Sequence, residues 1–205
     1  MMILIVGRPD SGKSLKAEEL AMDMSADDKR IYLATMIPYG EEGVIRVTKH
    51  KKLREGKGFV TVERTRDVGA LSDVYGYING VKASEATVLL ECMANLCANV
   101  MFNDNDNDCK RLSEDDTLRY VVNDILMLKD KVKNLIVVTN EFISEDDFDH
   151  DTLSYINVMN RINRALARES DRIYDITEGT WKIYENDQEH DNCIFDVFKD
   201  TDTAL

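Results

Sequence analysis

Met2-Ile3-Leu4-Ile5-Val6 runs directly into Gly7-Arg8-Pro9-Asp10-Ser11-Gly12-Lys13-Ser14, and this stretch decides the fold. A short, wholly apolar run is typical of a buried parallel strand. The turn after it fits the pattern G-x-x-x-x-G-K-[ST], in which backbone N–H groups surround the phosphates of a nucleotide. We expect Lys13 to contact the β- and γ-phosphates and the Ser14 hydroxyl to bind Mg²⁺. Gly12 lets the backbone approach the anion closely, because it has no Cβ.

The residues after this turn predict a helix over residues 13–24, with an apolar face made by Leu15, Ala17, Leu20 and Ala21. The N-terminus of such a helix carries partial positive charge and points at the bound phosphates. The same letters also occur by chance in an ordinary strand-to-helix turn. The strand before the turn and the helix after it favour a nucleotide site, because the motif requires both.

The composition limits the classes of function. The chain has 205 residues, 43% of them apolar, which is enough for one domain with a real core. Its net charge of −13 argues against nucleic acid or an anionic membrane surface as a general partner. We find no apolar run of membrane-spanning length and no signal-peptide layout, and the four cysteines lack C-x-x-C spacing. These features predict a cytoplasmic protein with reduced thiols that fill the core or the surface.

The rest of the chain alternates strand and helix patterns. Strands are predicted over residues 30–35, 59–63, 86–91 and 134–139, and a closing hairpin over residues 172–177 and 180–184. Helices are predicted over residues 44–53, 67–75 (capped by Asp67), 93–101, 118–128 and 153–166. This order predicts an α/β, P-loop NTPase-like (RecA-like) fold, whose mostly parallel sheet has helices on both faces and an antiparallel C-terminal edge strand.

Two segments fall outside this alternation. Residues 103–108 are an Asn/Asp tract that lacks the central glycine and distal glutamate of an EF-hand, so we expect a solvated connection. Residues 1–185 are expected to form the P-loop nucleotide-binding and transferase domain. Residues 186–205 are expected to be an acidic tail, frayed or docked on a partner.

Ligands of parallel α/β sheets bind beyond the carboxyl ends of the strands. Four groups fall at such ends: the Lys13 loop, Ala34-Thr35, Glu91 and Asn140-Glu141. An acid that leaves an apolar strand in a P-loop chain favours a role as a Mg²⁺ ligand for Glu91. A solvated strand end is the structural alternative for this residue.

A basic segment, Arg46 to Arg54, stands out in so acidic a chain and indicates contact with a polyanion. Of the three histidines, only His50 lies among cations, because His150 and His190 are flanked by acids. Neighbouring positive charge favours the neutral, nucleophilic form of an imidazole and gathers phosphate beside it. Attack on an α-phosphorus would give a covalent nucleotidyl-histidine. The alternative is a solvated basic helix face with an incidental histidine.

The sequence resembles the bifunctional adenosylcobinamide kinase / adenosylcobinamide-phosphate guanylyltransferase family of cobalamin nucleotide-loop assembly. The matches run in order from Met1 to about Tyr184. They comprise Met1 to Leu4 with Ser11 to Ser14; Tyr32 to Thr35; Arg46, His50 and Lys51; Thr61 to Glu63; Leu89 to Cys92 with Asn95 and Asn99; Val138 to Glu141; and Asn163 to Ala167 with Asp171.

This resemblance implies a two-step enzyme. It would phosphorylate adenosylcobinamide with ATP or GTP, and then pass GMP from GTP, through a guanylyl-histidine at His50, to adenosylcobinamide phosphate. The resemblance also implies a homo-oligomer, a trimer in the family. The nucleotide-contacting positions implied are Gly7, Arg8, Pro9, Asp10, Ser11, Gly12, Lys13, Ser14, Ala34, Thr35, Met36, Lys51, Lys52, Leu53, Arg54, Glu63 and Glu91.

The chain departs from the family pattern at the phosphate loop and after the fifth strand. Arg8 replaces the second glycine of the loop, and Asp10 stands where the family has arginine. An acidic stretch follows Asn140-Glu141 in place of a glycine. These departures leave two alternatives open: a histidine-dependent nucleotidyltransferase with another acceptor, and a catalytically reduced nucleotide-binding regulator or scaffold.

Overall fold

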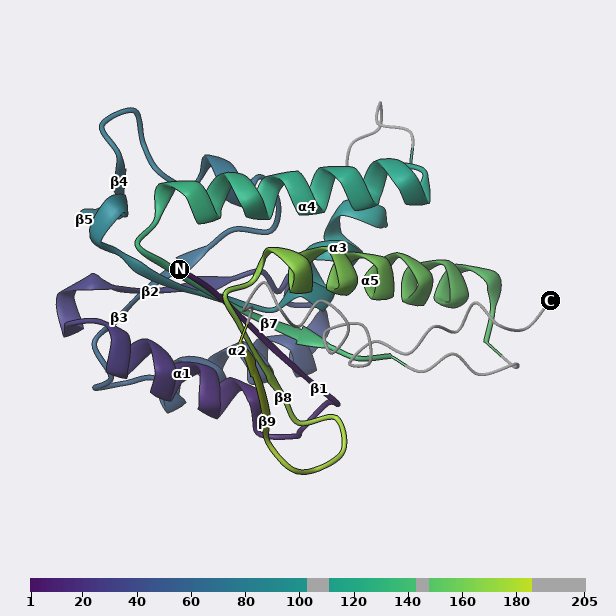
Figure 1. Ribbon diagram of the computed structural model, residues 1–205, viewed down its shortest axis with the longest axis horizontal. Helices are drawn as coiled ribbons and strands as arrows, with labels where there is room; N and C mark the ends of the chain where they lie inside the picture. Colours follow the sequence, from purple (N-terminus) through teal and green to yellow (C-terminus); the bar gives the residue numbers. More distant parts are fainter. Residues whose placement is uncertain (103–110, 143–147, 186–205) are drawn as a thin grey trace.

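A computed structural model describes residues 1–102, 111–142 and 148–185 of the chain. The Asn/Asp tract, most of the acidic stretch after Glu141 and the acidic tail therefore lie outside the described residues. The described part contains one seven-stranded sheet, in the order β3-β2-β6-β7-β1-β8-β9 (Figure 1). Its strands are β1 Met2–Gly7, β2 Arg30–Ala34, β3 Phe59–Glu63, β6 Thr87–Glu91, β7 Asn134–Asn140, β8 Arg172–Asp175 and β9 Lys182–Glu185.

All neighbouring strands of this sheet run parallel except β8 and β9, which pair antiparallel at one edge. One strand, β7, lies between β1, which leads into the phosphate loop, and β6, which ends in Glu91. The predicted fold class, including the antiparallel edge strand, is thus confirmed.

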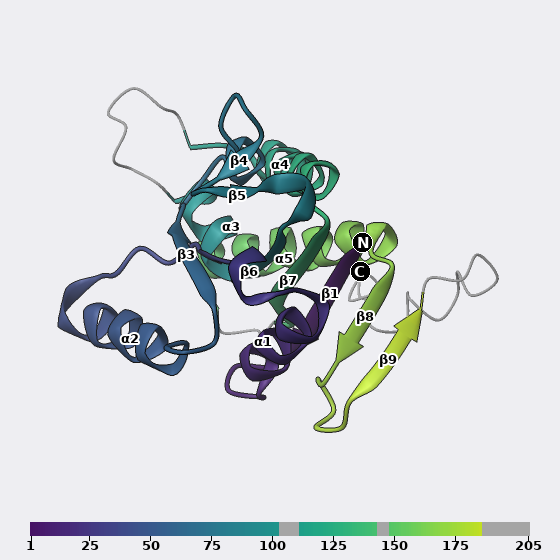
Figure 2. The ribbon, with the colours of Figure 1, turned by 90° about the vertical axis from the view of Figure 1, so that its left-hand side faces the viewer.

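The described residues form five α-helices: α1 Lys13–Met24, α2 Gly40–Leu53, α3 Met93–Met101, α4 Glu114–Lys131 and α5 His150–Glu169. Helix α1 packs on one face, while α3, α4 and α5 pack on the other (Figure 1). Helix α2 extends away from the sheet beside β3, as Figure 2 shows. Two of the helices begin at side-chain caps, since Ser113 accepts a hydrogen bond from the Asp116 N–H, and Asp149 accepts one from the Thr152 N–H.

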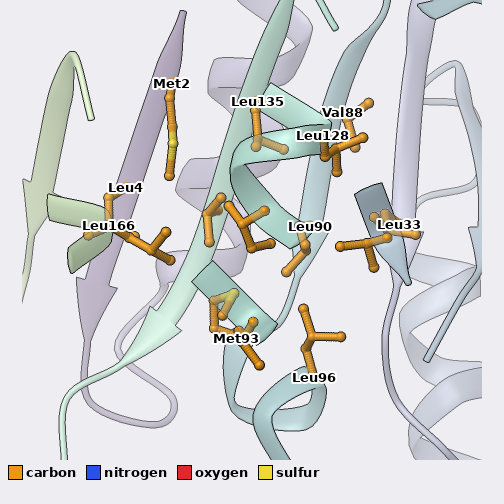
Figure 3. Packing of buried hydrophobic residues seen from close by; sticks show 14 of the residues in the cluster. Met2, Leu4, Leu33, Val88, Leu90, Met93, Leu96, Leu128, Leu135 and Leu166 are labelled. Carbon is orange, nitrogen blue, oxygen red and sulfur yellow. The ribbon is translucent and has the colours of Figure 1, made fainter. Parts of the chain in front are cut away.

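The core forms because strand residues alternate between the two faces. Figure 3 shows Leu4 of β1 together with Leu166 of α5, and Leu90 of β6 together with Leu96 of α3. All four of these side chains are fully buried. The opposite face packs against α1 in a second cluster, made of Ile3, Ile5, Ala17, Ala21, Tyr32, Leu89, Ile136, Val138 and Tyr174.

The helix predicted over residues 67–75 is wrong. The structure has one turn of 3₁₀ helix, Val68–Ala70, followed by a small hairpin of β4 Tyr77–Ile78 and β5 Val81–Lys82. Asp67 has a φ of 52°, a left-handed conformation that a helix N-cap does not adopt. The carboxylate of Asp124 on α4 instead accepts hydrogen bonds from the N–H groups of Val68 and Gly69, both at 2.7 Å. This tertiary contact holds the 3₁₀ turn, while Asn79 and Gly80, with φ of 46° and 85°, form the tight turn that joins β4 to β5.

None of the helices in residues 1–102, 111–142 and 148–185 combines the length and apolarity needed to cross a membrane.

Candidate active site

The phosphate loop connects β1 to α1 in the way that the motif requires. Gly12 has a φ of +88° and Asp10 a φ of 57°, so the chain passes twice through the left-handed region before the helix begins. The Lys13 side chain is 7% exposed, and its Nζ donates a hydrogen bond to the carbonyl oxygen of Arg8 at 2.7 Å. Burial lowers the pKa of Lys13, and the nearby Glu91 carboxylate opposes that shift.

Gly7, where the strand ends, has no room for a side chain. A Cβ there would lie 2.6 Å from Cγ2 of Ile176 and 2.8 Å from Oγ of Ser11. We expect Gly7→Ala to lower the free energy of unfolding by about 1–3 kcal/mol, because the crowded atoms must move. It should also weaken nucleotide binding, since Ser11 belongs to the phosphate loop. Urea unfolding and calorimetric titration with GTP measure the two effects, and wild-type values for both would contradict this geometry.

Ser14 and Glu91 meet at the base of the loop. The Ser14 hydroxyl donates a hydrogen bond to Oε1 of Glu91 at 2.8 Å, while Oε2 of Glu91 is buried without a hydrogen-bond partner. Burial raises the pKa of the Glu91 carboxyl to about 7, and the Ser14 hydrogen bond and Lys13 work against that shift. One hydroxyl and one carboxylate oxygen without a partner are hard oxygen donors of the kind that Mg²⁺ takes beside phosphates. These two residues therefore fit a magnesium ion.

Glu91 should make the stability of the protein depend on pH. Its pKa in the folded state is about 7, above the value of 4.5 for an unperturbed glutamate. The folded state therefore holds the proton more tightly, and the contribution of Glu91 to stability falls as the pH rises from about 4.5 to about 7. Relative to Glu91→Gln, which carries no titrating group, the wild type should lose about 2 kcal/mol between pH 5.5 and pH 8. Urea unfolding of both proteins without nucleotide or Mg²⁺ measures the difference, and a constant difference across this range would contradict burial of the carboxyl.

A cavity of about 380 Å³ lies over the carboxyl ends of β1, β2, β6 and β7. The predicted residues Lys13, Ala34, Glu91 and Asn140, from these strand ends, line it together. Helix α2 forms its opposite side with Val47, His50 and Lys51, and Arg54 follows at the end of that helix. The complete lining is Pro9, Asp10, Lys13, Ser14, Tyr32, Ala34, Met36, Pro38, Val47, His50, Lys51, Arg54, Glu63, Glu91, Cys92, Asn95 and Asn140.

Several predicted site residues lie outside this lining. Thr35 is fully buried, and its hydroxyl donates hydrogen bonds to the carbonyl oxygens of Glu91 and Cys92, at 3.1 and 2.8 Å. That contact ties β2 to the end of β6. The other predicted positions outside the lining are Gly7, Arg8, Ser11, Gly12 and Lys52, and the side chain of Leu53 lies outside the described part of the structure. Glu141 also lies outside it, although its neighbour Asn140 does not.

Arg54 is the most unusual side chain of the cavity. Its guanidinium carbon lies 3.4 Å from the centroid of the Tyr32 ring, and only 6% of the residue is exposed. Its Nε and Nη1 atoms are buried without hydrogen-bond partners. A buried cation with free donors is costly unless an anion satisfies it, so this arrangement suits a bound phosphate or carboxylate. Lys51 beside it forms an ion pair with Glu63 at 2.6 Å.

Sequence reasoning missed Tyr32, Pro38, Val47 and Cys92 as cavity residues. Cys92 was interpreted as filler, but it lines the cavity next to Glu91; burial raises the pKa of its thiol to about 11, so the group stays protonated. One signal for Tyr32 was available, because it lies two residues before Ala34 on the same strand and shares its face of the sheet. The stacking of Arg54 on Tyr32 carried no signal, since the two residues are 22 positions apart in the sequence.

Comparison with known proteins identifies the group to which this chain is related. The family model described as cobinamide kinase / cobinamide phosphate guanyltransferase matches residues 3–182. The chain belongs to this family. The resemblance drawn from the sequence motifs is therefore confirmed, and the chain is a member of a family of transferases.

Two curated proteins are also similar to this chain in sequence. The bifunctional adenosylcobalamin biosynthesis protein CobU of Escherichia coli (strain K12) is 34% identical over 111 residues, which is 53% of this chain and 56% of that protein. The protein of the same name from Salmonella typhimurium (strain LT2) is 26% identical over 191 residues, 87% of this chain and 97% of that protein. Among solved structures, the flagellar accessory protein FlaH of Methanocaldococcus jannaschii superposes with a TM-score of 0.40 at 14% identity, covering 91% of this chain and 79% of that one.

Proposed function

We propose that this chain carries out both reactions named in the family description: phosphorylation of adenosylcobinamide, and transfer of GMP from GTP to adenosylcobinamide phosphate. The observation that supports the second reaction most strongly is that His50 and Lys13 line one cavity, although 37 positions separate them in the sequence. A nucleophile and a phosphate-binding cation on one cavity are what nucleotidyl transfer requires.

In the kinase step, the hydroxyl oxygen of the acceptor attacks the γ-phosphorus of ATP or GTP. The bond from that phosphorus to the bridging oxygen breaks, the nucleoside diphosphate leaves, and the hydroxyl proton passes to solvent. Lys13 stabilises the negative charge on the transferring group, in a partly desolvated place where a cation acts strongly.

In the transferase step, a ring nitrogen of His50 attacks the α-phosphorus of GTP and pyrophosphate leaves. A phosphate oxygen of adenosylcobinamide phosphate then attacks the guanylyl phosphorus, the P–N bond breaks, and the imidazole is restored. Arg54 and Lys51 lie in the same cavity as His50 and supply positive charge beside the α-phosphate.

Ser14 and Glu91 are the residues that would hold Mg²⁺. When bound, this ion would neutralise charge on the phosphate oxygens. Tyr32, Pro38 and Val47 give the cavity apolar walls that exclude water from the reacting phosphates.

We also propose that residues 1–185 act as one domain, that the protein assembles as a homotrimer, and that it works in the cytoplasm. Sedimentation equilibrium of the purified chain tests the trimer.

One observation favours a different function. Asp10 lines the cavity as a carboxylate, where the family has a cation, and it would repel a triphosphate. This supports the alternative of a catalytically reduced nucleotide-binding regulator or scaffold. The acceptor is also open to test, because a histidine-dependent nucleotidyltransferase could use another phosphorylated compound.

Labelled GTP separates these functions. The pure protein is incubated with Mg²⁺ and either α-labelled or γ-labelled GTP, denatured, and examined for protein-bound label. The proposed enzyme should retain only the α-label, in an acid-labile and alkali-stable form, and adenosylcobinamide phosphate should discharge it. A regulator or scaffold would retain neither label. An enzyme for another acceptor would take the α-label but would not discharge it to adenosylcobinamide phosphate.

A further inference from the structure

A second hollow, of about 410 Å³, lies next to the nucleotide cavity at the carboxyl ends of β2 and β3. Residues 36–38 form one side of it, and residues 63–67 form the other. The two spaces share Met36, Pro38 and Glu63 as lining residues. A molecule in the hollow would therefore be a direct neighbour of a nucleotide in the cavity. We call this space the side hollow.

The side hollow is lined by two arginines, Arg64 and Arg66. In the described part of the chain, Arg64 donates a hydrogen bond from Nε to the carbonyl oxygen of Arg66 at 3.1 Å, and the Arg66 guanidinium lies 5.7 Å from the Tyr120 ring. Neither arginine forms an ion pair with a carboxylate of residues 1–102, 111–142 or 148–185. Cations without a carboxylate partner are unexpected in a chain with 39 acidic and 26 basic residues.

The carboxylates near these arginines are bound to other groups. Glu63 forms its ion pair with Lys51 at 2.6 Å, and Asp67 accepts a hydrogen bond from the Tyr120 hydroxyl. Asp124, the carboxylate that faces Arg64 from α4, accepts two backbone N–H groups. The guanidiniums of the side hollow are thus left to bind an external anion.

Hydrogen bonds hold both walls of the side hollow in place. The side-chain amide of Asn99 on α3 donates to the carbonyl oxygens of Thr35 and Thr65, at 2.7 and 3.1 Å, and so joins the segments that follow β2 and β3. The Arg64 N–H donates to the carbonyl oxygen of Ala34 at 2.9 Å. The two arginines are therefore carried on a backbone that is fixed before a ligand arrives, which reduces the entropy lost on binding.

We propose that the side hollow binds the phosphate monoester of the acceptor, with Arg64 and Arg66 as its anion contacts. A guanidinium presents paired donors that match phosphate oxygens, and two of them suit a dianionic monoester. Met36, Ile37 and Pro38 offer an apolar wall to the carbon chain that carries the phosphate. This assignment rests on the proposed function, because it supplies the place from which the acceptor phosphate attacks the guanylyl group on His50.

The test uses single-turnover discharge. Wild type, Arg64→Gln, Arg66→Gln and the double variant are first labelled with α-labelled GTP and Mg²⁺, freed of nucleotide, and mixed with increasing adenosylcobinamide phosphate. We expect the acceptor concentration for half-maximal discharge to rise about tenfold in each single variant and about a hundredfold in the double variant. Arg172→Gln, on β8 near the opposite edge of the sheet, is the matched control and should behave as wild type.

The labelling step with α-labelled GTP reports on folding and on the nucleotide cavity, because neither Arg64 nor Arg66 lines that cavity. A double variant that takes the label normally but is discharged at the wild-type concentration would overturn the side-hollow proposal and leave the proposed function standing. A wild type that takes no label would overturn the proposed function instead. If the double variant fails to take the label, Arg66→Lys serves in its place, because it keeps the charge but loses the paired donors. An unchanged half-maximal concentration in Arg66→Lys would likewise overturn the proposal.

Discussion

Replacing Lys13 with alanine is expected to reduce both phosphoryl and guanylyl transfer by about a thousandfold or more. The Lys13 ammonium is buried in the phosphate loop, where the low local dielectric strengthens its attraction for phosphate oxygens. Lys13 also opposes the burial that raises the pKa of the Glu91 carboxyl, so its removal raises that pKa further and weakens the pair that fits Mg²⁺. Steady-state rates with adenosylcobinamide and labelling with GTP measure the two reactions separately.

Lys16→Ala is the matched control for this variant. Lys16 lies one turn further along α1, is more exposed, and forms an ion pair with Glu19 at 3.6 Å. The Lys16→Ala protein should retain both activities within about twofold, because a surface ion pair contributes little to stability. Lys13→Ala should remain folded, since the change removes a buried charge. A folded Lys13→Ala protein with near-wild-type rates would contradict the assignment of the phosphate loop.

The His50→Ala variant is expected to lose protein labelling by α-labelled GTP completely, and GMP transfer should fall by about 10⁴-fold or more. The covalent route needs a nitrogen nucleophile at this position, and alanine provides none. Phosphorylation of adenosylcobinamide should continue, because the hydroxyl oxygen of adenosylcobinamide attacks the γ-phosphorus directly, without a histidine intermediate. The predicted result is an enzyme that has kept one of its two reactions.

His150→Ala provides the comparison for His50→Ala. The His150 side chain is 96% exposed at the start of α5, and the residue does not line the cavity. The His150→Ala protein should take the label from α-labelled GTP and transfer GMP as the wild type does. Loss of the kinase reaction together with the transferase in His50→Ala would indicate that the histidine supports the cavity and does not act as a nucleophile.

The strand and helix pattern predicted most of the fold because local and tertiary preferences agree in this chain. The β1 run is apolar at every position, and in the structure it is fully buried between two parallel neighbours. The segment after Asp67 shows where this agreement ends. Its apolar residues have helical spacing, but Val74 is 93% exposed and the chain forms a hairpin. The contact with Asp124, 56 positions away from Val68, holds the turn that begins this segment, and the Asn79-Gly80 turn joins the two strands of the hairpin.

For the site, the sequence could predict residues that belong to local motifs or to strand ends. Lys13, Ser14 and Glu91 were predicted in this way, and the structure places them together. It could not predict which face of α2 turns toward the phosphate loop, because no residue of that helix fixes its packing locally. Arg54 on the Tyr32 ring and the two arginines of the side hollow depend on the same three-dimensional placement.

The most direct test of the central claim, that His50 attacks the nucleotide held by Lys13, is to locate the guanylyl group by mass spectrometry. The protein is incubated with GTP and Mg²⁺, digested at alkaline pH to preserve a P–N bond, and the modified peptide is sequenced by fragmentation. The account predicts one GMP adduct, on His50, that is absent from Lys13→Ala. An adduct on any other residue, or transfer of GMP to the acceptor without an adduct, would contradict it.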